Sequence, residues 1–504
     1  MAGRSGRPFL TPCGDVRRFG ASGAPGAERG ELSGPDPEGT PRRPRGDTVT
    51  VPHHAHRTIP HAPGLIPVLG HAPALLRDPL GFIGALGRVG GVVRVRLGPR
   101  TVCVVTDPAL VHTLLVGLAH DCPPQGVRDT LRAAFTAERV ASCVPVVEEV
   151  TRERVGRWRH GHVIDVAREM NHLALEIVTR ALFGARLRAD SALAFHRALP
   201  DLVRGQLVRS LYPHRALARL PLPVNRGYDA ALAVLDRVVD QTLARGGQSN
   251  GDGGGDGDGE RTLLALLRAT PDPATGSPLD EAAVRSEAIT MFGAGTEPVA
   301  TTLTWLFHEL LRHPRVCARL MAELDGLPRA APDGSGDGLT LDALGRLPYT
   351  ARVLREVTRL HAPHAFLLRT AARDVDLGPY RVPAGTGLLY SLTAPHRDPA
   401  HHRDPLRFDP DRWLADRPGG AAAGPHAFLP FGVGEHRCVG ETFAWAELAV
   451  VAATVLRAWQ PLPVAGSHAR EVVSGTVQAQ GLSMALAART PGGPAATEAA
   501  EATP

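Results

Sequence analysis

The segment FLPFGVGEHRCVGETFA, residues 428–444, is the most informative part of the sequence. Gly434 and Gly440 flank Cys438, and a helical pattern begins just after the cysteine. Free backbone N–H groups at a helix N-terminus, together with nearby cations, lower the pKa of a thiol and make it a metal ligand or a nucleophile. The glycines let the backbone approach something flat and bulky. From these residues alone, a structural cysteine, a nucleophile and a metal ligand all remain open.

Upstream of this segment, the strongest helical pattern runs from Ser277 to Arg312, with apolar residues at steps of three or four. Ser277 is the expected N-cap. At roughly 1.5 Å per residue such a helix is about 50 Å long and would cross the whole molecule. Its middle, Gly293–Pro298, reads GAGTEP, and Pro298 cannot donate a hydrogen bond to the carbonyl of Ala294. This flaw predicts a kink or bulge, either beside a functional surface or simply tolerated in a buried helix.

The rest of the chain divides into one large unit and two tails. Residues 1–57 are rich in Gly, Pro and Arg and lack aliphatic periodicity, which predicts a disordered tail, and residues 490–504 predict a second one. Residues 58–489 are expected to form one mainly α-helical unit with a smaller β region. A β-hairpin is expected where β-branched runs at 90–97 and 101–106 flank a Gly-Pro-Arg turn. Residues 246–259 predict a flexible loop between helices.

Composition excludes several classes of protein. The chain has 504 residues, 43% hydrophobic and 21% charged, with a formal net charge of +5, and all 56 basic residues are arginines. It can therefore bury a large core and is not a strongly basic nucleic-acid binder. The 6 cysteines are widely separated, which argues against a disulfide framework and a zinc knuckle and suits a reducing compartment. Without an apolar run of membrane-spanning length or a secretory signal, the protein is expected to be soluble and cytoplasmic.

Residues 428–444 closely resemble the haem-binding signature of the cytochrome P450 family, F-x-x-G-x-[RH]-x-C-x-G-x-x-x-A. The slots are filled by Phe431, Gly434, His436, Cys438, Gly440 and Ala444. The similarity then extends over most of residues 58–489.

Three further motifs of that family are present upstream of this segment, at the expected places in the chain. Glu356 and Arg359 match its E-x-x-R pair, Arg412 lies in the segment whose arginine completes that charge cluster, and residues 294–297 match the A-G-x-[DE] of its central helix. An E-x-x-R pair alone occurs by chance in many helices. The resemblance therefore rests on the whole set, which implies the cytochrome P450 fold, with a long central helix over a haem held by a cysteine loop.

The resemblance also implies a cofactor, haem b, and a set of site residues. Cys438 is the implied iron ligand, and His436, Arg369 and Arg128 are the implied propionate contacts. The cofactor-binding positions are then Cys438, His436, Arg369, Arg128, Phe431, Gly432, Gly440, Ala294, Gly295 and Ala444. The implied catalytic residues are Glu297, Thr296 and Thr301. The cluster of Glu356, Arg359 and Arg412 is expected to hold the cysteine loop and to be structural.

Two departures from the family pattern bear on function. Most monooxygenases of the family carry a threonine after the acidic residue of the central helix, and its hydroxyl helps to deliver protons to dioxygen, whereas this chain has Pro298 there. Thr301 and Thr302 lie one turn further on. In the second departure, Pro124 stands where an aromatic residue or histidine is usual, and the loop before Arg128 looks shortened.

The resemblance favours a monomeric haem-thiolate monooxygenase that hydroxylates or epoxidises a lipophilic small molecule, with electrons from a ferredoxin or flavodoxin and its reductase. Residues 293–295 imply a mostly apolar substrate. The local sequence around the haem-binding signature is similar to that of terpene-oxidising members. Because of Pro298, two alternatives stay open: a peroxide-dependent oxidase or isomerase of the same fold, and a catalytically impaired haem protein. No nucleic acid and no membrane span are expected.

Overall fold

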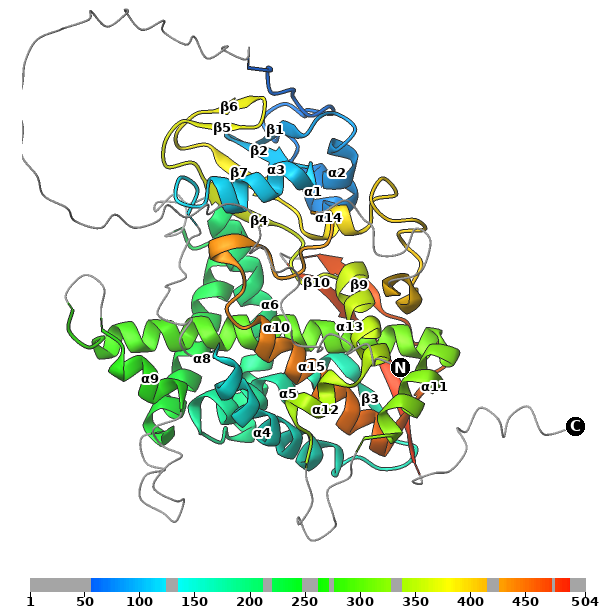
Figure 1. Cartoon of the computed structure of the whole chain (residues 1–504). Coiled ribbons are helices and arrows are strands. Elements are labelled where there is room, and N and C mark those ends of the chain that lie inside the picture. The colour runs from blue at the N-terminus through cyan, green and yellow to red at the C-terminus, as the bar shows by residue number, and fades with distance from the viewer. Residues whose placement is uncertain are drawn as a thin grey trace, which may run out of the picture.

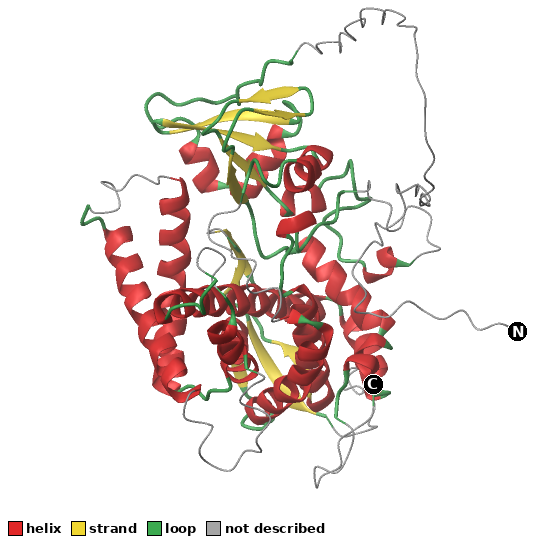
Figure 2. Ribbon diagram, turned by 60° about the vertical axis from the view of Figure 1, so that its left-hand side comes forward, coloured by secondary structure: helices red, strands yellow, loops and turns green. Residues whose placement is uncertain are grey.

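The computed structural model describes residues 56–123, 135–211, 220–246, 262–271, 276–327, 338–414, 426–473 and 476–489. A sheet-rich part lies above a larger helical part, which helix α10 (Glu281–Arg312) crosses from side to side (Figures 1 and 2). This arrangement confirms the predicted class, mainly α with a smaller β region. The predicted C-terminal tail, all but the last two residues of the N-terminal one and nearly all of the 246–259 loop lie outside the described residues.

The upper sheet contains the predicted hairpin. Strands β1 (Val92–Leu97) and β2 (Arg100–Val105) pair antiparallel, with Leu97 opposite Arg100 at the turn. Strand β7 (Gly387–Tyr390) then pairs parallel to β2, and β4 (Leu367–Thr370) pairs antiparallel to β7. The sheet order β1-β2-β7-β4 therefore joins an N-terminal hairpin to strands that follow it by more than 250 residues.

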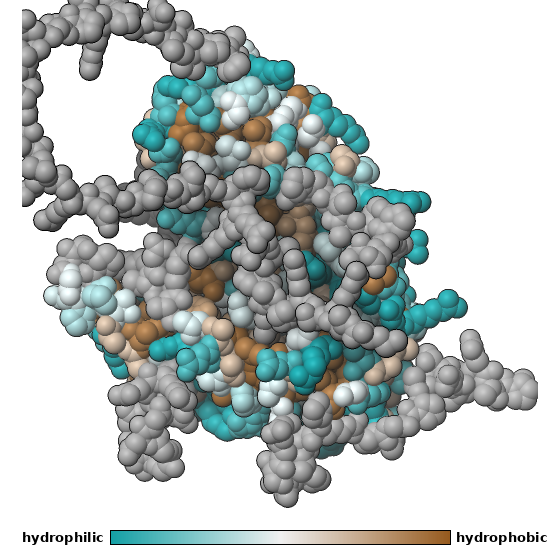
Figure 3. Space-filling view, viewed as in Figure 1, coloured by the Kyte–Doolittle hydropathy of each residue, from teal (hydrophilic) through white to brown (hydrophobic). Residues whose placement is uncertain are grey.

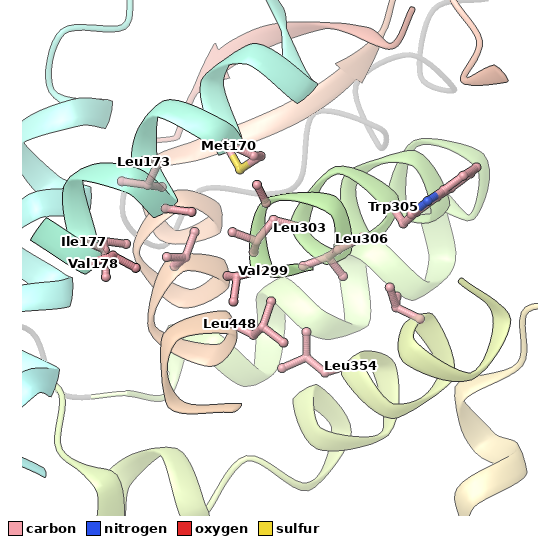
Figure 4. Close-up of a cluster of buried hydrophobic side chains, with 14 of the residues drawn as sticks. Met170, Leu173, Ile177, Val178, Val299, Leu303, Trp305, Leu306, Leu354 and Leu448 are labelled. Atoms are coloured by element: carbon pink, nitrogen blue, oxygen red, sulfur yellow. The ribbon is translucent and has the colours of Figure 1, made fainter. Parts of the chain in front are cut away.

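The lower part is built around α10. Its apolar side chains pack against α5 (Val166–Ile177), α13 (Pro348–Leu360) and α15 (Glu441–Ala458). Figure 4 shows the centre of this cluster, where Leu303 and Leu306 of α10 lie among Met170, Leu354 and Leu448. All five side chains are 2% exposed or less, so α10 is fixed by the core along this stretch.

Helix α10 begins three residues later than predicted. The side chain of Asp280, not of Ser277, accepts a hydrogen bond from the backbone N–H of Ala283 and so caps the helix. Pro278 instead bridges Pro271, which keeps this segment outside the helix. Pro298 lies inside α10, which is one continuous α-helix of 32 residues, all of them described, so a bulge is absent there and the kink stays a prediction.

The other elements frame these two parts. The remaining helices are α1 (Ala72–Arg77), α2 (Pro79–Leu86), α3 (Pro108–His112), α4 (Ala137–Val155), α6 (Ala189–Leu211), α8 (Pro223–Gly246), α9 (Leu263–Ala269), α11 (Pro314–Asp325), α12 (Leu341–Gly345) and α14 (Thr393–His396). Short π-helical turns are η1 (Thr113–Gly117) and η3 (Val178–Leu182), and 3₁₀ turns are η5 (Pro410–Trp413) and η6 (Gly434–His436). The smaller sheets are β3 (Val163–Asp165) with β11 (Ser483–Ala488) and β8 (Trp459–Pro463), β9 (Arg470–Val473) with β10 (Val477–Gln480), and β5 (Val375–Leu377) with β6 (Tyr380–Val382).

The surface and the cysteines complete the description of the fold. On the face shown in Figure 3, hydrophobic residues lie between the sheet-rich and the helical parts and also along the helical part. The five cysteines among the described residues are all free. In the part of the chain that the structure describes, every helix is too short or too polar to span a lipid bilayer.

Candidate active site

The Cys438 loop is a tight backbone structure that ends where α15 begins. The N–H of Cys438 donates a hydrogen bond to the carbonyl of Phe431 at 2.9 Å, which closes the loop. Gly432 and Gly434 have φ values of +72° and +77°, which glycine adopts most readily. A Cβ atom on Gly434 would lie 2.8 Å from the carbonyl oxygen of Leu115, so the loop packs directly on turn η1.

The surroundings of the Cys438 thiol correct one expectation. Cys438 is exposed in the chain alone, yet enough protein surrounds its thiol that burial raises its pKa above the usual value. A hydrogen bond from the Gly440 N–H and the charge of Arg437 act in the opposite direction, while Glu441 reinforces the rise. The pKa of the protein thiol is therefore raised, not lowered as the helix N-terminus predicted, because desolvation outweighs the backbone N–H groups.

A buried charge cluster lies behind the loop, and it contains the predicted residues. Arg359 donates two hydrogen bonds to Glu356, at 2.8 and 2.9 Å, and Arg412 donates a third at 3.2 Å. The indole of Trp413 and the N–H of Asp409 also donate to the same carboxylate. Glu356 and Arg359 are 0% exposed, so the carboxylate is fully desolvated and fully satisfied.

His396 connects this cluster to the cysteine loop. Its backbone carbonyl accepts a hydrogen bond from Arg359 at 2.6 Å, and its Nε2 accepts one from the N–H of Leu429 at 3.1 Å. Burial holds the pKa of His396 well below its usual value, so the ring is neutral and Nε2 can act as an acceptor. No motif in the sequence singles out this histidine.

Helix α10 presents an open stretch of backbone at its middle. A Cβ on Gly293 would meet no atom within 4 Å, and Ala294 is exposed although buried residues precede and follow it. Gly295, in contrast, packs on Val178 of η3, at 3.0 Å from an added Cβ. The side chain of Thr296 is fully buried, and no described group hydrogen-bonds to its hydroxyl. Gly293 and Ala294 therefore leave a flat, apolar surface in the middle of α10, between the buried residues Phe292 and Thr296.

Glu297 points into a polar environment. Its Oε1 accepts hydrogen bonds from the hydroxyl of Thr476 and, at 3.0 Å, from the side-chain amide of Gln478. Burial raises its pKa, although these two hydrogen bonds lower it in part. Thr301, one turn further on, lines the same pocket as Glu297, as the spacing of four residues requires. Thr302 does not: its hydroxyl donates to the carbonyl of Pro298 at 2.8 Å.

Arg369 lies on β4, with 9% of its surface exposed. Its guanidinium stands 5.9 Å from the ring centroid of Tyr390, and among the described residues no carboxylate pairs with it. A buried arginine without an anion is a strong candidate for an anionic ligand. Arg128 and the side chain of His436 lie outside what the structure describes.

The remaining predicted positions belong to the packing of the loop. Phe431 contacts Trp445 edge to face, with ring centroids 5.2 Å apart, and an added Cβ on Gly440 would make only an ordinary contact with Phe135. The N–H of Ala444 donates to the carbonyl of Gly440 at 2.8 Å in the first turn of α15. Phe431, Gly432 and Gly440 thus lie in the loop that carries Cys438, and Ala444 lies in the first turn of α15, which follows it.

Comparison with known proteins adds a family and a fold. The cytochrome P450 family model matches residues 125–475. The chain is 34% identical to cyclooctat-9-en-7-ol 5-monooxygenase of Streptomyces melanosporofaciens, over 81% of this chain and 90% of that protein. It is 32% identical to pentalenene oxygenase of Streptomyces avermitilis, over 86% of this chain and 98% of that protein. The crystal structure of the haem domain of cytochrome P450DA superposes with a TM-score of 0.70 at 24% identity, covering 86% and 98%.

Proposed function

The chain belongs to the cytochrome P450 family and is a haem b monooxygenase, and we propose that it oxidises a terpenoid or a similar lipophilic secondary metabolite. The relatives named above support the substrate class, because two of them are oxygenases of terpene skeletons by name. The apolar surface at Gly293 and Ala294 supports it as well, since a hydrocarbon binds best where no polar group must be desolvated.

The described residues fit the cofactor. Arg369 is buried without a carboxylate among them and would bind a propionate, and the open surface at Gly293 and Ala294 would leave room for a flat macrocycle and a substrate. We propose that the Cys438 thiolate would bind the haem iron, with the surrounding loop residues holding it in place. When bound, the haem supplies the redox chemistry, and thiolate ligation favours cleavage of the O–O bond.

The overall reaction of a monooxygenase sets what the protein must provide: R–H + O₂ + 2 e⁻ + 2 H⁺ gives R–OH + H₂O. The chain must bind R–H, exclude bulk water from it and deliver two protons. The candidate acid is Glu297, which is buried on α10 beside a pocket that polar side chains line in part. We therefore propose Glu297 as the proton donor, with Thr301 as the adjacent hydroxyl.

A ferredoxin or flavodoxin with its reductase is the proposed electron donor. Of the arginines near the cysteine loop, Arg352 pairs with Asp411 at 3.6 Å and Arg437 pairs with Glu441. Arg355 stacks over the ring of Trp413, 5.1 Å from its centroid. Because two of these charges are compensated, we expect docking to depend more on shape and less on ionic strength than in a purely electrostatic complex.

The test is a substrate screen of the haem-loaded enzyme. Terpene hydrocarbons and alcohols should cause a low-to-high spin shift, and binders should be hydroxylated with ferredoxin, reductase and dioxygen. The reduced carbon-monoxide spectrum should show thiolate ligation, which Cys438→Ser should abolish while the matched change Cys143→Ser leaves it. A thiolate spectrum that survives in Cys438→Ser would overturn the assignment of the ligand.

Pro298 favours one second candidate, a peroxide-dependent oxidation. Pro298 has no hydroxyl, and the hydroxyl of Thr302 already donates a hydrogen bond to the Pro298 carbonyl. Dioxygen activation therefore has fewer local proton donors than usual in the family. The two functions separate in one comparison. Product formed with hydrogen peroxide alone, and none with ferredoxin and dioxygen, would select the second candidate.

A further inference from the structure

A surface pocket of about 350 Å³ lies where the end of α4, the loop 156–162, strand β3 and the start of α5 meet. Arg157 of the loop and Arg168 of α5 both line it, and both are exposed. None of the site residues described above lines this pocket. It is therefore a second concave surface, and its most prominent polar groups are guanidinium groups.

The two carboxylates in the wall of the pocket already have partners within the protein. Arg154 donates two hydrogen bonds to Glu169, both at 2.8 Å, and the indole of Trp158 donates a third at 3.3 Å. The side chain of Asp165 caps α5, because it accepts a hydrogen bond from the backbone N–H of Arg168 at 3.0 Å. Its charge is thus directed at the positive end of the helix dipole. Neither acid is left to neutralise a further cation.

The guanidinium groups of Arg157 and Arg168 are uncompensated. Among the described residues, no carboxylate forms an ion pair with either of them, whereas Arg154 of the same pocket is paired with Glu169. Two cations from different elements therefore line one pocket without an anion. A planar carboxylate is satisfied by the fork of a single arginine, but a phosphate group presents acceptor oxygens in several directions. Two separate guanidinium groups thus favour a phosphate.

The frame of the pocket is preformed. The N–H of Gly161 donates to the carbonyl of Leu486 at 2.8 Å, and the N–H of Leu486 donates to the carbonyl of His162 at 2.9 Å, so the loop is held against β11. A ligand would pay little to order this backbone. The volume is within the roughly 300–1,000 Å³ that small-molecule pockets have. Val163, 57% exposed, adds an apolar wall beside the cations, which suits the organic part of a phosphate ester.

From this geometry we infer that the pocket is a binding site for a phosphate group, either free or carried by a small organic molecule. Arg157 and Arg168 bind the phosphate oxygens, and Val163 contacts the organic part where there is one. The site is separate from the oxidation proposed above, so its test needs no substrate of that reaction.

The test is a calorimetric titration of the haem-loaded full chain with inorganic phosphate and with phenyl phosphate, at constant ionic strength. Arg157→Gln and Arg168→Gln should each weaken binding about tenfold, because each removes charge-assisted hydrogen bonds. Asp165→Asn should bind several-fold more tightly, since it removes a like charge while asparagine keeps the helix cap. Arg88→Gln, which removes an exposed arginine outside the pocket, is the matched control and should bind as wild type.

The two ligands distinguish the two sources of the phosphate group. Tighter binding of phenyl phosphate, lost in Val163→Ser, would assign the site to a phosphate ester, and equal affinities would assign it to free phosphate. The haem absorption spectrum should stay unchanged, which places the ligand outside the substrate site.

Three results would overturn the inference: no binding to the wild type, equal affinities in the wild type and both arginine variants, or acetate bound as tightly as phosphate. Because the substituted side chains are exposed, all the variants should fold as the wild type does.

Discussion

The backbone N–H of Leu429 donates a hydrogen bond to Nε2 of His396 at 3.1 Å, which ties the start of the cysteine loop to a buried histidine. The carbonyl of the same histidine accepts from Arg359, and Arg359 is paired with Glu356. One continuous set of hydrogen bonds therefore runs from the charge cluster to the loop that carries Cys438. The first two predictions concern its two ends.

His396→Leu should loosen the cysteine loop without unfolding the protein. The change removes the acceptor for the Leu429 N–H while leaving Glu356 and Arg359 paired, and an orphaned backbone donor costs about 1–3 kcal/mol. Haem transfer to apomyoglobin should become several-fold faster, while the free energy of unfolding falls by no more than that amount. An unchanged transfer rate would show that His396 does not hold the loop.

Glu356→Gln should be far more damaging. It leaves the buried Arg359 and Arg412 without their carboxylate, and breaking such a pair costs about 3–5 kcal/mol. The control is Asp411→Asn, which breaks the partly exposed pairs with Arg319 and Arg352 nearby and should cost about 0–1 kcal/mol in urea unfolding. Equal losses in the two variants would contradict a special role for the buried cluster.

Arg369→Leu should weaken haem retention more than it weakens the fold. The guanidinium is buried and has no carboxylate partner among the described residues, so removing it relieves an uncompensated charge in the haem-free protein. We expect the apoprotein to be as stable as wild type or more stable, and the haem to dissociate at least tenfold faster. The exposed Arg373→Leu, four residues on, controls for loss of positive charge.

Glu447 should make stability fall as the pH rises. It is 0% exposed, no described group hydrogen-bonds to its carboxyl oxygens, and burial raises its pKa well above 4.5. The folded protein therefore keeps a proton that the unfolded chain releases above pH 4.5, so stability is greatest below that pH and is lost progressively above it. The melting temperature of Glu447→Gln minus that of the wild type should increase as the pH rises from about 5 to about 8. For Glu281→Gln, at an exposed site, the difference in melting temperature from the wild type should stay constant over this pH range.

Pro298→Thr should stabilise α10 and should increase the fraction of electrons that end in product instead of hydrogen peroxide. The threonine restores an N–H that can donate to the Ala294 carbonyl, and it adds a hydroxyl on α10 next to Glu297. The melting temperature should rise, and hydrogen peroxide release per electron pair should fall several-fold. If peroxide release stays at the wild-type value, the missing hydroxyl does not limit the reaction.

The local features of the fold were predictable because local rules govern them. The hairpin at β1 and β2 follows from β-branched runs around a turn, and the pairing of Glu356 with Arg359 follows from their i, i+3 spacing on one helix. The predicted N-cap of α10 was three residues too early. Ser277 and Asp280 are both residues that can cap a helix, and the choice between them depends on how the preceding segment packs.

The partners of Glu297 were not predictable from the sequence. Thr476 and Gln478 follow it by 179 and 181 residues, the first just before strand β10 and the second on it, and no spacing rule relates residues so far apart in the sequence. His396 was missed for the same reason, since only the tertiary fold brings its ring to Leu429. Long-range hydrogen bonds of this kind complete the candidate site, whereas the motifs supply only its first residues.

The contact between Gly434 and turn η1 also limits how this enzyme can be altered. Any side chain at position 434 would press on the Leu115 carbonyl, so a library that varies the loop should leave this glycine fixed. At Gly432 an added Cβ would meet nothing within 4 Å, and only the φ of +72° restricts the choice. Asparagine tolerates that conformation best among the larger residues, so the accessible variation around the thiol begins at position 432.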